Sequence, residues 1–229
     1  MALQLPLAFE FRANQTFDDF YPGSNQEIID HLKKTVTGTG EQFIYLWGEA
    51  GQGKSHLLQA CCRLASNQNI SVFYFDLLNN APTDPEFFTG LDQFEIVCLD
   101  NIDLISASDE WELSFFNFFN RLRDCNHRII LSASKTSNTL GFKLPDLQTR
   151  LNWGLPLKIQ PLNDDDKIAA LTQKAQLMGF EITPQVARFL LTHYDRNLTS
   201  LWLMLDKLDR ASLAAQRKLT IPFLKQILN

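Results

Sequence analysis

Apolar residues in the first two thirds of the chain form two kinds of pattern. Short continuous runs, which predict buried strands, cover residues 43–47, 70–75, 94–99, 128–131 and 155–159. Between these runs, apolar residues recur at three- and four-residue steps, which predicts helices over residues 26–36, 57–64 and 109–123. Strands that alternate with helices are typical of a parallel sheet with helices on both faces. We therefore expect an α/β fold.

The helix predicted over residues 109–123 carries an aromatic stripe: Trp111, Phe115, Phe118, Phe119 and Leu122. An aromatic stripe at helical spacing can be a platform on which bases stack, but it is far more often part of a core. We interpret it as core.

The pattern changes after Pro161. Apolar residues with helical spacing then predict three helices and a short fourth, over residues 164–178, 183–194, 198–215 and 221–228. No run after Ile159 predicts a strand. We expect an α/β domain at residues 13–160 and a small all-helical subdomain at residues 161–229. Residues 1–12 have no clear period and are predicted to be a tail.

A phosphate-binding motif stands between the first predicted strand and the helix that follows it. Its spacing is Gly, four residues, Gly-Lys-Ser, and its residues are Gly48, Glu49, Ala50, Gly51, Gln52, Gly53, Lys54 and Ser55. In such a P-loop the backbone N–H groups and the helix N-terminus surround a phosphate. We expect Lys54 to reach the outer phosphates and Ser55 to ligate Mg²⁺. A glycine-rich turn without a ligand is the alternative, and the strand-to-helix context counts against it.

Polar residues near other strand ends extend this predicted site. Asp100 follows the run 94–99 and is the candidate carboxylate for holding Mg²⁺. The next residue is Asn101, and because an amide can orient water but cannot take its proton, we expect weak hydrolysis by this chain alone. Asp103 is close in sequence, but strand geometry does not place it equivalently. Ser134 either senses a terminal phosphate or only starts a turn.

Arg150 stands just before the last predicted strand. An arginine at such an edge can enter a neighbouring subunit's site and stabilise transition-state charge in trans. A surface arginine that pairs with an acid is the alternative, and the residues alone favour it.

Composition narrows the class of protein. The chain has 21 Lys and Arg against 26 Asp and Glu, and a net charge of −5 argues against binding DNA by broad phosphate neutralisation. The four cysteines form no C-x-x-C pair, and the four histidines have no metal-ligand spacing, so we expect core cysteines and a reducing, cytoplasmic setting. No apolar run approaches the length of a membrane span, and no signal peptide begins the chain.

Four stretches resemble the AAA+ ATPase domain of the bacterial replication initiator DnaA: residues 16–25, 53–60, 129–131 and 150–154. The resemblance covers nearly the whole chain, without counterparts of the initiator's DNA-binding helix-turn-helix and N-terminal interaction domains. A lone domain of this kind with a short N-terminal tail resembles the Hda class of DnaA-related regulatory inactivators. Residues 162–167, 205–212 and 215–223 strengthen this closer resemblance.

The resemblance implies a mechanism. Hda-like proteins carry ADP, bind the DNA-loaded sliding clamp through the tail and stimulate ATP hydrolysis by DnaA, which prevents re-initiation. The resemblance places Arg150 at the position of the trans-acting arginine, and it places Phe20, Tyr21 and His56 on nucleotide-binding segments. The implied cofactors are Mg²⁺ and ADP or ATP. The implied clamp-binding residues are Leu3, Gln4, Leu5, Pro6 and Leu7.

Three departures from the family pattern matter. Ala2 stands where the clamp-binding tail normally has glutamine, unless Gln4 serves with one residue deleted. Ser134 replaces the initiator's acidic sensor. Thr199 stands where the lid arginine normally contacts nucleotide, and Arg196, three residues earlier, is expected to face elsewhere on the helix.

Two other functions stay open at this stage. One is an autonomous AAA+ ATPase of the helicase-loader type, which Asn101 and Thr199 count against. The other is a DNA-binding initiator fragment, which the acidic balance counts against, so that only weak or indirect DNA contact is expected. For any of these functions, a homo-oligomer is possible.

Overall fold

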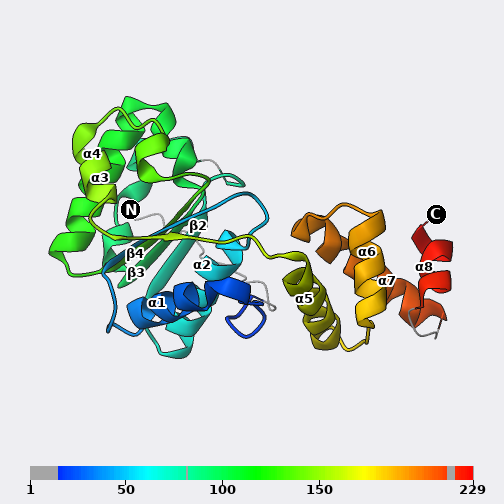
Figure 1. Cartoon of the computed structure of the whole chain (residues 1–229). Helices are drawn as coiled ribbons and strands as arrows, with labels where there is room; N and C mark the ends of the chain where they lie inside the picture. The colour runs from blue at the N-terminus through cyan, green and yellow to red at the C-terminus, as the bar shows by residue number, and fades with distance from the viewer. Residues whose placement is uncertain (1–14, 81, 216–219, 229) are drawn as a thin grey trace. The chain divides into compact units, whose positions relative to one another are not determined.

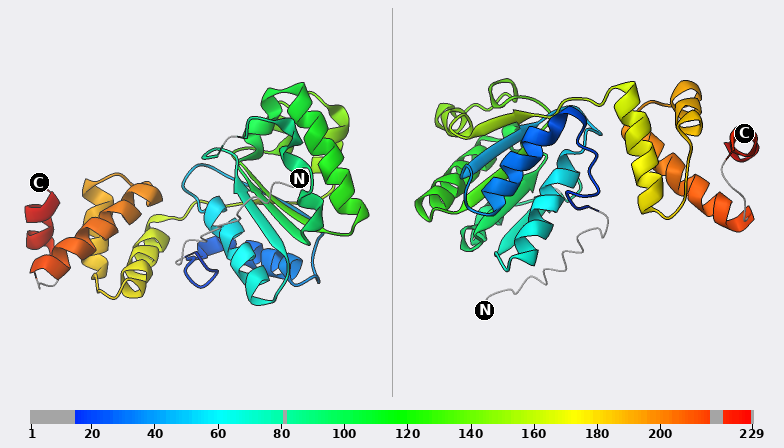
Figure 2. Two further views of the ribbon diagram at one scale, coloured as in Figure 1. Left: turned by 180° about the vertical axis from the view of Figure 1, so that it is seen from behind. Right: turned by 60° about the horizontal axis from the view of Figure 1, so that its bottom comes forward.

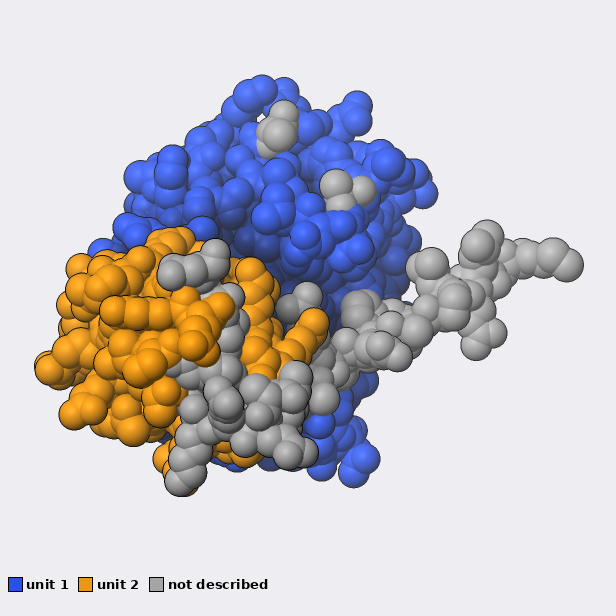
Figure 3. Space-filling model, turned by 90° about the vertical axis from the view of Figure 1, so that its right-hand side faces the viewer, with its two compact units in different colours: residues 1–20, 25–159 blue, residues 21–24, 160–229 orange. Residues whose placement is uncertain are grey.

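The structure is a computed structural model that describes residues 15–80, 82–215 and 220–228. The described residues divide into two compact units (Figure 3). The first contains residues up to 20 and residues 25–159, and the second contains residues 21–24 and the residues from 160 onward. The predicted clamp-binding tail, residues 1–12, lies outside the described residues, as does the Ala2 or Gln4 register question.

The first unit is built on one five-stranded parallel sheet, which confirms the predicted fold class (Figure 1). Its strands are β1 (Phe43–Trp47), β2 (Val72–Asp76), β3 (Ile96–Asp100), β4 (Arg128–Ala133) and β5 (Leu155–Lys158), and they lie in the order β2-β3-β4-β1-β5. The central strands are buried, as continuous apolar runs in a parallel sheet should be.

Several strand boundaries differ from the predicted ones. β2 and β3 begin two residues later than the apolar runs that predicted them, at Val72 and Ile96. Just before these strands, Ser71 and Glu95 bond through side chains: the Ser71 N–H and O–H donate to Glu95 Oε2, each at 3.0 Å, and the Glu95 N–H donates to Ser71 Oγ at 3.0 Å. β4 also runs longer than predicted, to Ala133.

Helices cover both faces of the sheet (Figures 1 and 2). Helices α1 (Gln26–Val36) and α2 (Lys54–Asn67) pack with one cluster of buried side chains, and α3 (Asp109–Asp124) and α4 (Pro145–Leu151) pack with the other. The stripe on α3 is core, as predicted: four of its residues are buried and Trp111 is partly buried. Sequence analysis missed α4, because only Leu147 and Leu151 of its seven residues face the core.

Short 3-10 helices complete the connections, at Gly23–Asn25, Pro85–Phe88, Leu91–Gln93, Ile102–Ala107 and Ser137–Thr139. Cys61, Cys62 and Cys98 are buried among apolar side chains, which confirms that they are core residues. Burial raises the pKa of the Cys61 and Cys62 thiols, so they stay protonated.

The second unit is helical, with α5 (Asp164–Leu177), α6 (Pro184–His193), α7 (Leu198–Ala215) and α8 (Ile221–Leu228). Side-chain caps start two of these helices: Asn163 Oδ1 accepts the Asp166 N–H at 2.8 Å, and Thr183 Oγ1 accepts the Val186 N–H at 3.3 Å. Leucines from α5, α6, α7 and α8 form its core. Among the helices described in either unit, none combines the length and apolarity needed to cross a membrane.

Candidate functional site

The predicted P-loop leads directly from the carboxyl end of β1 into α2. Gly51 and Gly53 have φ angles of +79° and +92°, which favour glycine because a side chain would be strained there. A Cβ on Gly53 would also lie only 2.6 Å from Phe20 Cε2. The Gln52 side chain closes the loop by accepting the Glu49 N–H at 3.0 Å. The loop therefore has the tight turn that a phosphate cradle needs, with a helix N-terminus behind it.

Lys54 is a buried cation whose hydrogen bonds go only to neutral groups. Its side chain is 8% exposed, and Nζ donates to the carbonyl oxygens of Gly48 at 2.6 Å and Glu49 at 2.9 Å. Desolvation lowers the pKa of Lys54, and the charges of Asp100 and Asp103 oppose that shift. A buried ammonium bonded to neutral main-chain carbonyls fits a phosphate-bearing ligand, whose negative charge would stabilise the charged form.

Asp100 is a fully buried carboxylate at the end of β3. The Tyr74 hydroxyl donates to its Oδ2 at 3.0 Å, and the Ser132 hydroxyl donates to its Oδ1. Burial and the Asp100 charge raise the pKa of Tyr74, which keeps the phenol a neutral donor. Asp100 and Ser55, the second residue of α2, are the oxygen donors that would hold Mg²⁺ here.

The chain turns sharply after Asp100, and this turn brings Asp103 back to the sheet edge. Asn101 has a left-handed φ of +61°, and its side-chain amide donates to Asp76 Oδ1 at 2.9 Å. A 3-10 helix then places Asp103 beside Ser134, whose N–H donates to the two carboxylate oxygens at 3.0 and 3.1 Å and whose hydroxyl donates to Oδ1. Sequence analysis gave Asp103 no place in the site, because nothing in the strand pattern signals this turn.

Of the predicted base-flanking residues, Phe20 belongs to the first unit and Tyr21 to the second. The Phe20 ring lies 5.4 Å from the His56 ring, centroid to centroid, and His56 Nε2 lies 2.7 Å from the Thr16 carbonyl oxygen. The Tyr21 hydroxyl donates to Asp166 Oδ1 at 3.3 Å, and burial and that carboxylate raise its pKa. The nucleotide contacts of Phe20, Tyr21 and His56 stay predictions.

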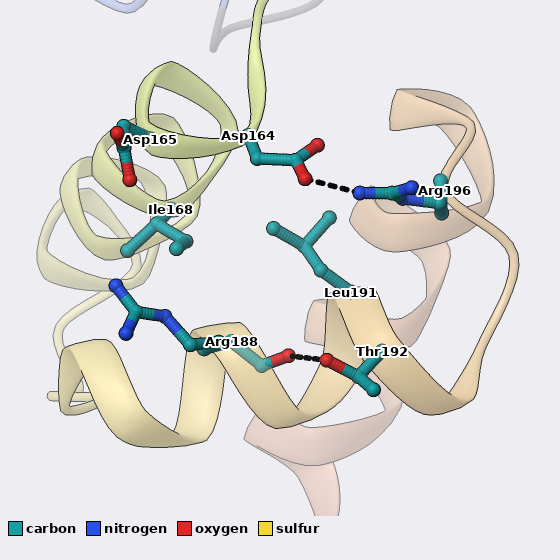
Figure 4. A pocket seen from close by; sticks show the side chains of 7 residues that line it. All are labelled: Asp164, Asp165, Ile168, Arg188, Leu191, Thr192 and Arg196. Carbon is teal, nitrogen blue, oxygen red and sulfur yellow. Dashed lines mark hydrogen bonds and ion pairs between the residues drawn. The ribbon is translucent and has the colours of Figure 1, made fainter.

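In the second unit, Arg196 pairs with Asp164 beside a hollow of about 470 Å³ (Figure 4). The Lys167 ammonium donates to the Arg196 carbonyl oxygen at 3.1 Å. Arg196 was predicted to lie on the same helix as Thr199 and to face another direction. That placement on the helix was wrong, since α7 begins at Leu198 and Arg196 lies in the preceding loop. Thr199 lies in the first turn of α7, where its N–H donates to Asn197 Oδ1 at 2.8 Å.

Arg150 lies on α4 and stacks on aromatic rings instead of pairing with an acid. Its guanidinium carbon is 3.9 Å from the centroid of the Trp153 ring and 5.8 Å from that of Phe116. The Nη1 atom is buried and has no hydrogen-bond partner among the described residues. No carboxylate within the described ranges forms an ion pair with this guanidinium, so the surface ion pair considered above is not present.

Arg150 and the P-loop lie at opposite ends of the sheet. Gly154 packs on the first residue of β1, since a Cβ there would be 2.2 Å from the Phe43 ring. Trp153 lines a hollow of about 220 Å³ that also includes Gln42 and His127, which precede β1 and β4. The P-loop instead follows the last residue of β1. The stacked arginine is therefore at the amino ends of the strands and its own P-loop at their carboxyl ends.

Solved structures with the same fold include DnaA proteins and a Holliday junction branch migration motor. A replication initiator DnaA, bound to AMPPCP and single-stranded DNA, matches 86% of this chain and 65% of its own length at 22% identity, with a TM-score of 0.74. Domain III of DnaA from Thermotoga maritima matches 94% of this chain and 96% of its own length at 18% identity, with a TM-score of 0.80. The Thermotoga maritima RuvB branch migration motor matches 96% of this chain and 72% of its own length at 14% identity, with a TM-score of 0.69.

Two family profiles match the chain itself. The bacterial DnaA ATPase domain matches residues 11–158, and the Hda lid domain matches residues 164–228. Together they account for the sheet with its P-loop and for the helical unit. The chain belongs to the DnaA family of AAA+ proteins, with a lid of the Hda type.

Proposed function

We propose that this chain is a nucleotide-binding regulator of DNA replication that stimulates ATP hydrolysis by the initiator DnaA and so prevents re-initiation. The observation that carries the proposal is Arg150, a guanidinium with no acidic partner among the described residues, held on Trp153 at the end of the sheet away from its own P-loop. An arginine placed in this way is suited to a neighbour's nucleotide, where it stabilises the charge of the transferring phosphoryl group.

The P-loop of this chain would bind ADP or ATP with Mg²⁺ as a structural ligand. Lys54 would contact the phosphates, and Ser55 and Asp100 would hold the ion. The bound ion would supply charge neutralisation at the phosphates. Asn101 supplies a neutral amide, which cannot take a proton from water and so cannot act as the general base; its amide group is held by donating to Asp76 Oδ1 at 2.9 Å. This chemistry supports nucleotide binding with little hydrolysis by the chain alone.

The N-terminal tail, residues 1–12, would bind the sliding clamp. Leu3, Gln4, Leu5, Pro6 and Leu7 would bind the DNA-loaded sliding clamp and bring the chain to DnaA on DNA. The net charge of −5 supports recruitment through a protein rather than through direct phosphate contacts.

One observation favours a second candidate, an autonomous AAA+ ATPase. Asp103 lies against Ser134, and its charge acts on the pKa of Lys54. A carboxylate at this edge could take the proton of an attacking water in place of Asn101. In that case the chain would hydrolyse ATP without DnaA.

The test is ATP hydrolysis by DnaA on clamp-loaded DNA, measured without this protein, with it, and with its Arg150→Ala and Arg150→Lys variants. A trans-acting arginine contributes about 10³-fold or more to the rate, so Arg150→Ala should return hydrolysis to the unstimulated level. Arg150→Lys should recover little, because an ammonium lacks the planar fork. The control is Arg188→Ala, an exposed arginine in the second unit, which should stimulate like the wild type. No stimulation, with ATP hydrolysis by this chain alone, would support the autonomous ATPase instead.

A further inference from the structure

We infer that Trp153 is a positioning residue for Arg150: it holds the guanidinium in the orientation needed to enter a partner's nucleotide site while leaving its charge unneutralised. The inference rests on the proposed function and names a second residue that the trans-acting step needs. It concerns the surface formed by Arg150, Trp153, Phe116 and Arg123.

The contact between Arg150 and Trp153 is a close stack. At 3.9 Å between the guanidinium carbon and the ring centroid, the separation is well within the range of a cation–π interaction. Phe116 of α3 gives a second, more distant contact at 5.8 Å. Stacking restricts the orientation of the guanidinium plane, because a planar cation gains most when it lies over the ring face.

Unlike an ion pair, stacking leaves the N–H groups and the charge of the guanidinium available to bind a phosphate. A carboxylate partner would accept hydrogen bonds from the guanidinium N–H groups and neutralise the positive charge. That ion pair would have to break before Arg150 could bind a phosphate. A ring face accepts no conventional hydrogen bond. The Nη1 atom is buried and has no hydrogen-bond partner among the described residues, so no hydrogen bond at this atom has to be broken before the guanidinium binds a phosphate.

Trp153 is itself anchored through its main chain. Its N–H donates to the Arg150 carbonyl oxygen at 3.0 Å, which closes the turn at the end of α4. The next residue, Gly154, has no room for a side chain, since a Cβ would meet the Phe43 ring at 2.2 Å. The turn is thereby packed onto the start of β1, and the platform is tied to the rigid sheet.

The indole is exposed despite its size. Trp153 is 57% exposed, and Arg123 approaches the ring at 5.9 Å from its guanidinium carbon to the centroid. A large ring in this position is poorly explained by core packing, because most of its surface remains in water. Its position is explained by what it holds, since a ring that carries a trans-acting arginine must reach the surface with it.

The experiment uses the full chain in the DnaA hydrolysis assay on clamp-loaded DNA, with titration of Trp153→Ala and Trp153→Phe. Because small misplacements of a catalytic group cost up to about 10²-fold, Trp153→Ala should lower maximal stimulation by about tenfold or more. The concentration giving half-maximal stimulation should change little. Trp153→Phe keeps a ring face and should recover most of the stimulation. The control is Leu78→Ala, which removes an exposed apolar side chain of 62% exposure in the same unit and should behave as wild type.

Comparison of the two single variants separates this inference from the proposed function. If Arg150→Ala abolishes stimulation while Trp153→Ala retains it, the positioning role is overturned and the proposed function stands. If Trp153→Ala changes only the half-maximal concentration, the ring is a docking residue and the inference is also wrong. If Arg150→Ala has no effect, the proposed function fails first.

Discussion

Two buried tyrosines in the first unit allow a matched test of how much the hydrogen bond to Asp100 contributes to the free energy of unfolding. The Tyr74 hydroxyl donates to the Asp100 carboxylate at 3.0 Å, whereas the Tyr45 hydroxyl donates to the Lys135 carbonyl oxygen at 2.8 Å. Both rings are buried, with exposed fractions of 9% and 1%. The changes Tyr74→Phe and Tyr45→Phe thus remove the same group from buried positions, and the acceptor left behind is charged only at Tyr74. The Tyr74 hydroxyl also accepts from Gln59 Nε2 at a longer 3.3 Å, and Tyr74→Phe removes that contact too.

The expected magnitudes follow from that difference. A hydrogen bond to a charged group contributes about 1.5–3 kcal/mol to stability and one to a neutral group about 0.5–1.5 kcal/mol. We expect Tyr74→Phe to cost about 1 kcal/mol more of unfolding free energy than Tyr45→Phe. In a chain of this size that difference corresponds to about 2–4 °C in the midpoint of thermal unfolding.

The assay is thermal and urea unfolding of both variants, followed by circular dichroism, with and without nucleotide and Mg²⁺. Since partners that orient a metal-binding carboxylate affect metal affinity by about tenfold or more, Tyr74→Phe should also weaken Mg²⁺-dependent nucleotide binding, and Tyr45→Phe should not. Equal costs for the two variants, with unchanged Mg²⁺ dependence in both, would refute the reasoning that Tyr74 orients a functional carboxylate.

Two further predictions concern the same unit. Gly53→Ala should lower the free energy of unfolding by about 1–2 kcal/mol, because its φ of +92° strains any residue with a side chain, and the new Cβ, 2.6 Å from Phe20, should displace that ring and weaken nucleotide binding. The control is Gly90→Ala, which has a φ of +82° and open space around it. It should lower the free energy of unfolding measured in urea and leave nucleotide affinity unchanged. Burial raises the pKa values of Tyr45 and Tyr74 above the ordinary value of about 10, so the folded state holds the phenol protons more tightly than the unfolded state does. The contribution of these two tyrosines to the unfolding free energy should therefore be fully present below about pH 10 and be lost above it, in step with the phenolate absorbance, and a flat profile through alkaline pH would contradict the shift.

The parallel sheet was predictable because its central strands are continuous apolar runs between helical patterns. The exact strand boundaries were less predictable. Ser71 and Glu95, just before β2 and β3, bond across two segments that lie far apart in sequence, and no local pattern contains that contact. Helix α4 was missed for a related reason, since seven residues with two core positions give too little period to detect.

Parts of the candidate site were likewise predictable from the sequence, and other parts were not. The P-loop and Asp100 were predictable because their spacing and strand-end position are local features. The contact of Asp103 with Ser134 depends on a turn at Asn101 that has a positive φ, and asparagine tolerates that conformation without requiring it. The stack of Arg150 on Trp153 could not be inferred from the residues alone, which favoured an ion pair.

A parallel sheet has two chemically different ends, and in this protein the P-loop lies at one end and the stacked arginine at the other. β1 is five residues long, so about 16 Å of strand separates the start that packs against Gly154 from the end that continues into the P-loop. Any association that brings the arginine of one protomer to the nucleotide of the next is consequently head-to-tail, and it has a direction. A chain of this kind would act on the neighbour at its arginine end and leave the neighbour at its nucleotide end untouched. The order in which protomers stack would then decide which bound nucleotide is hydrolysed.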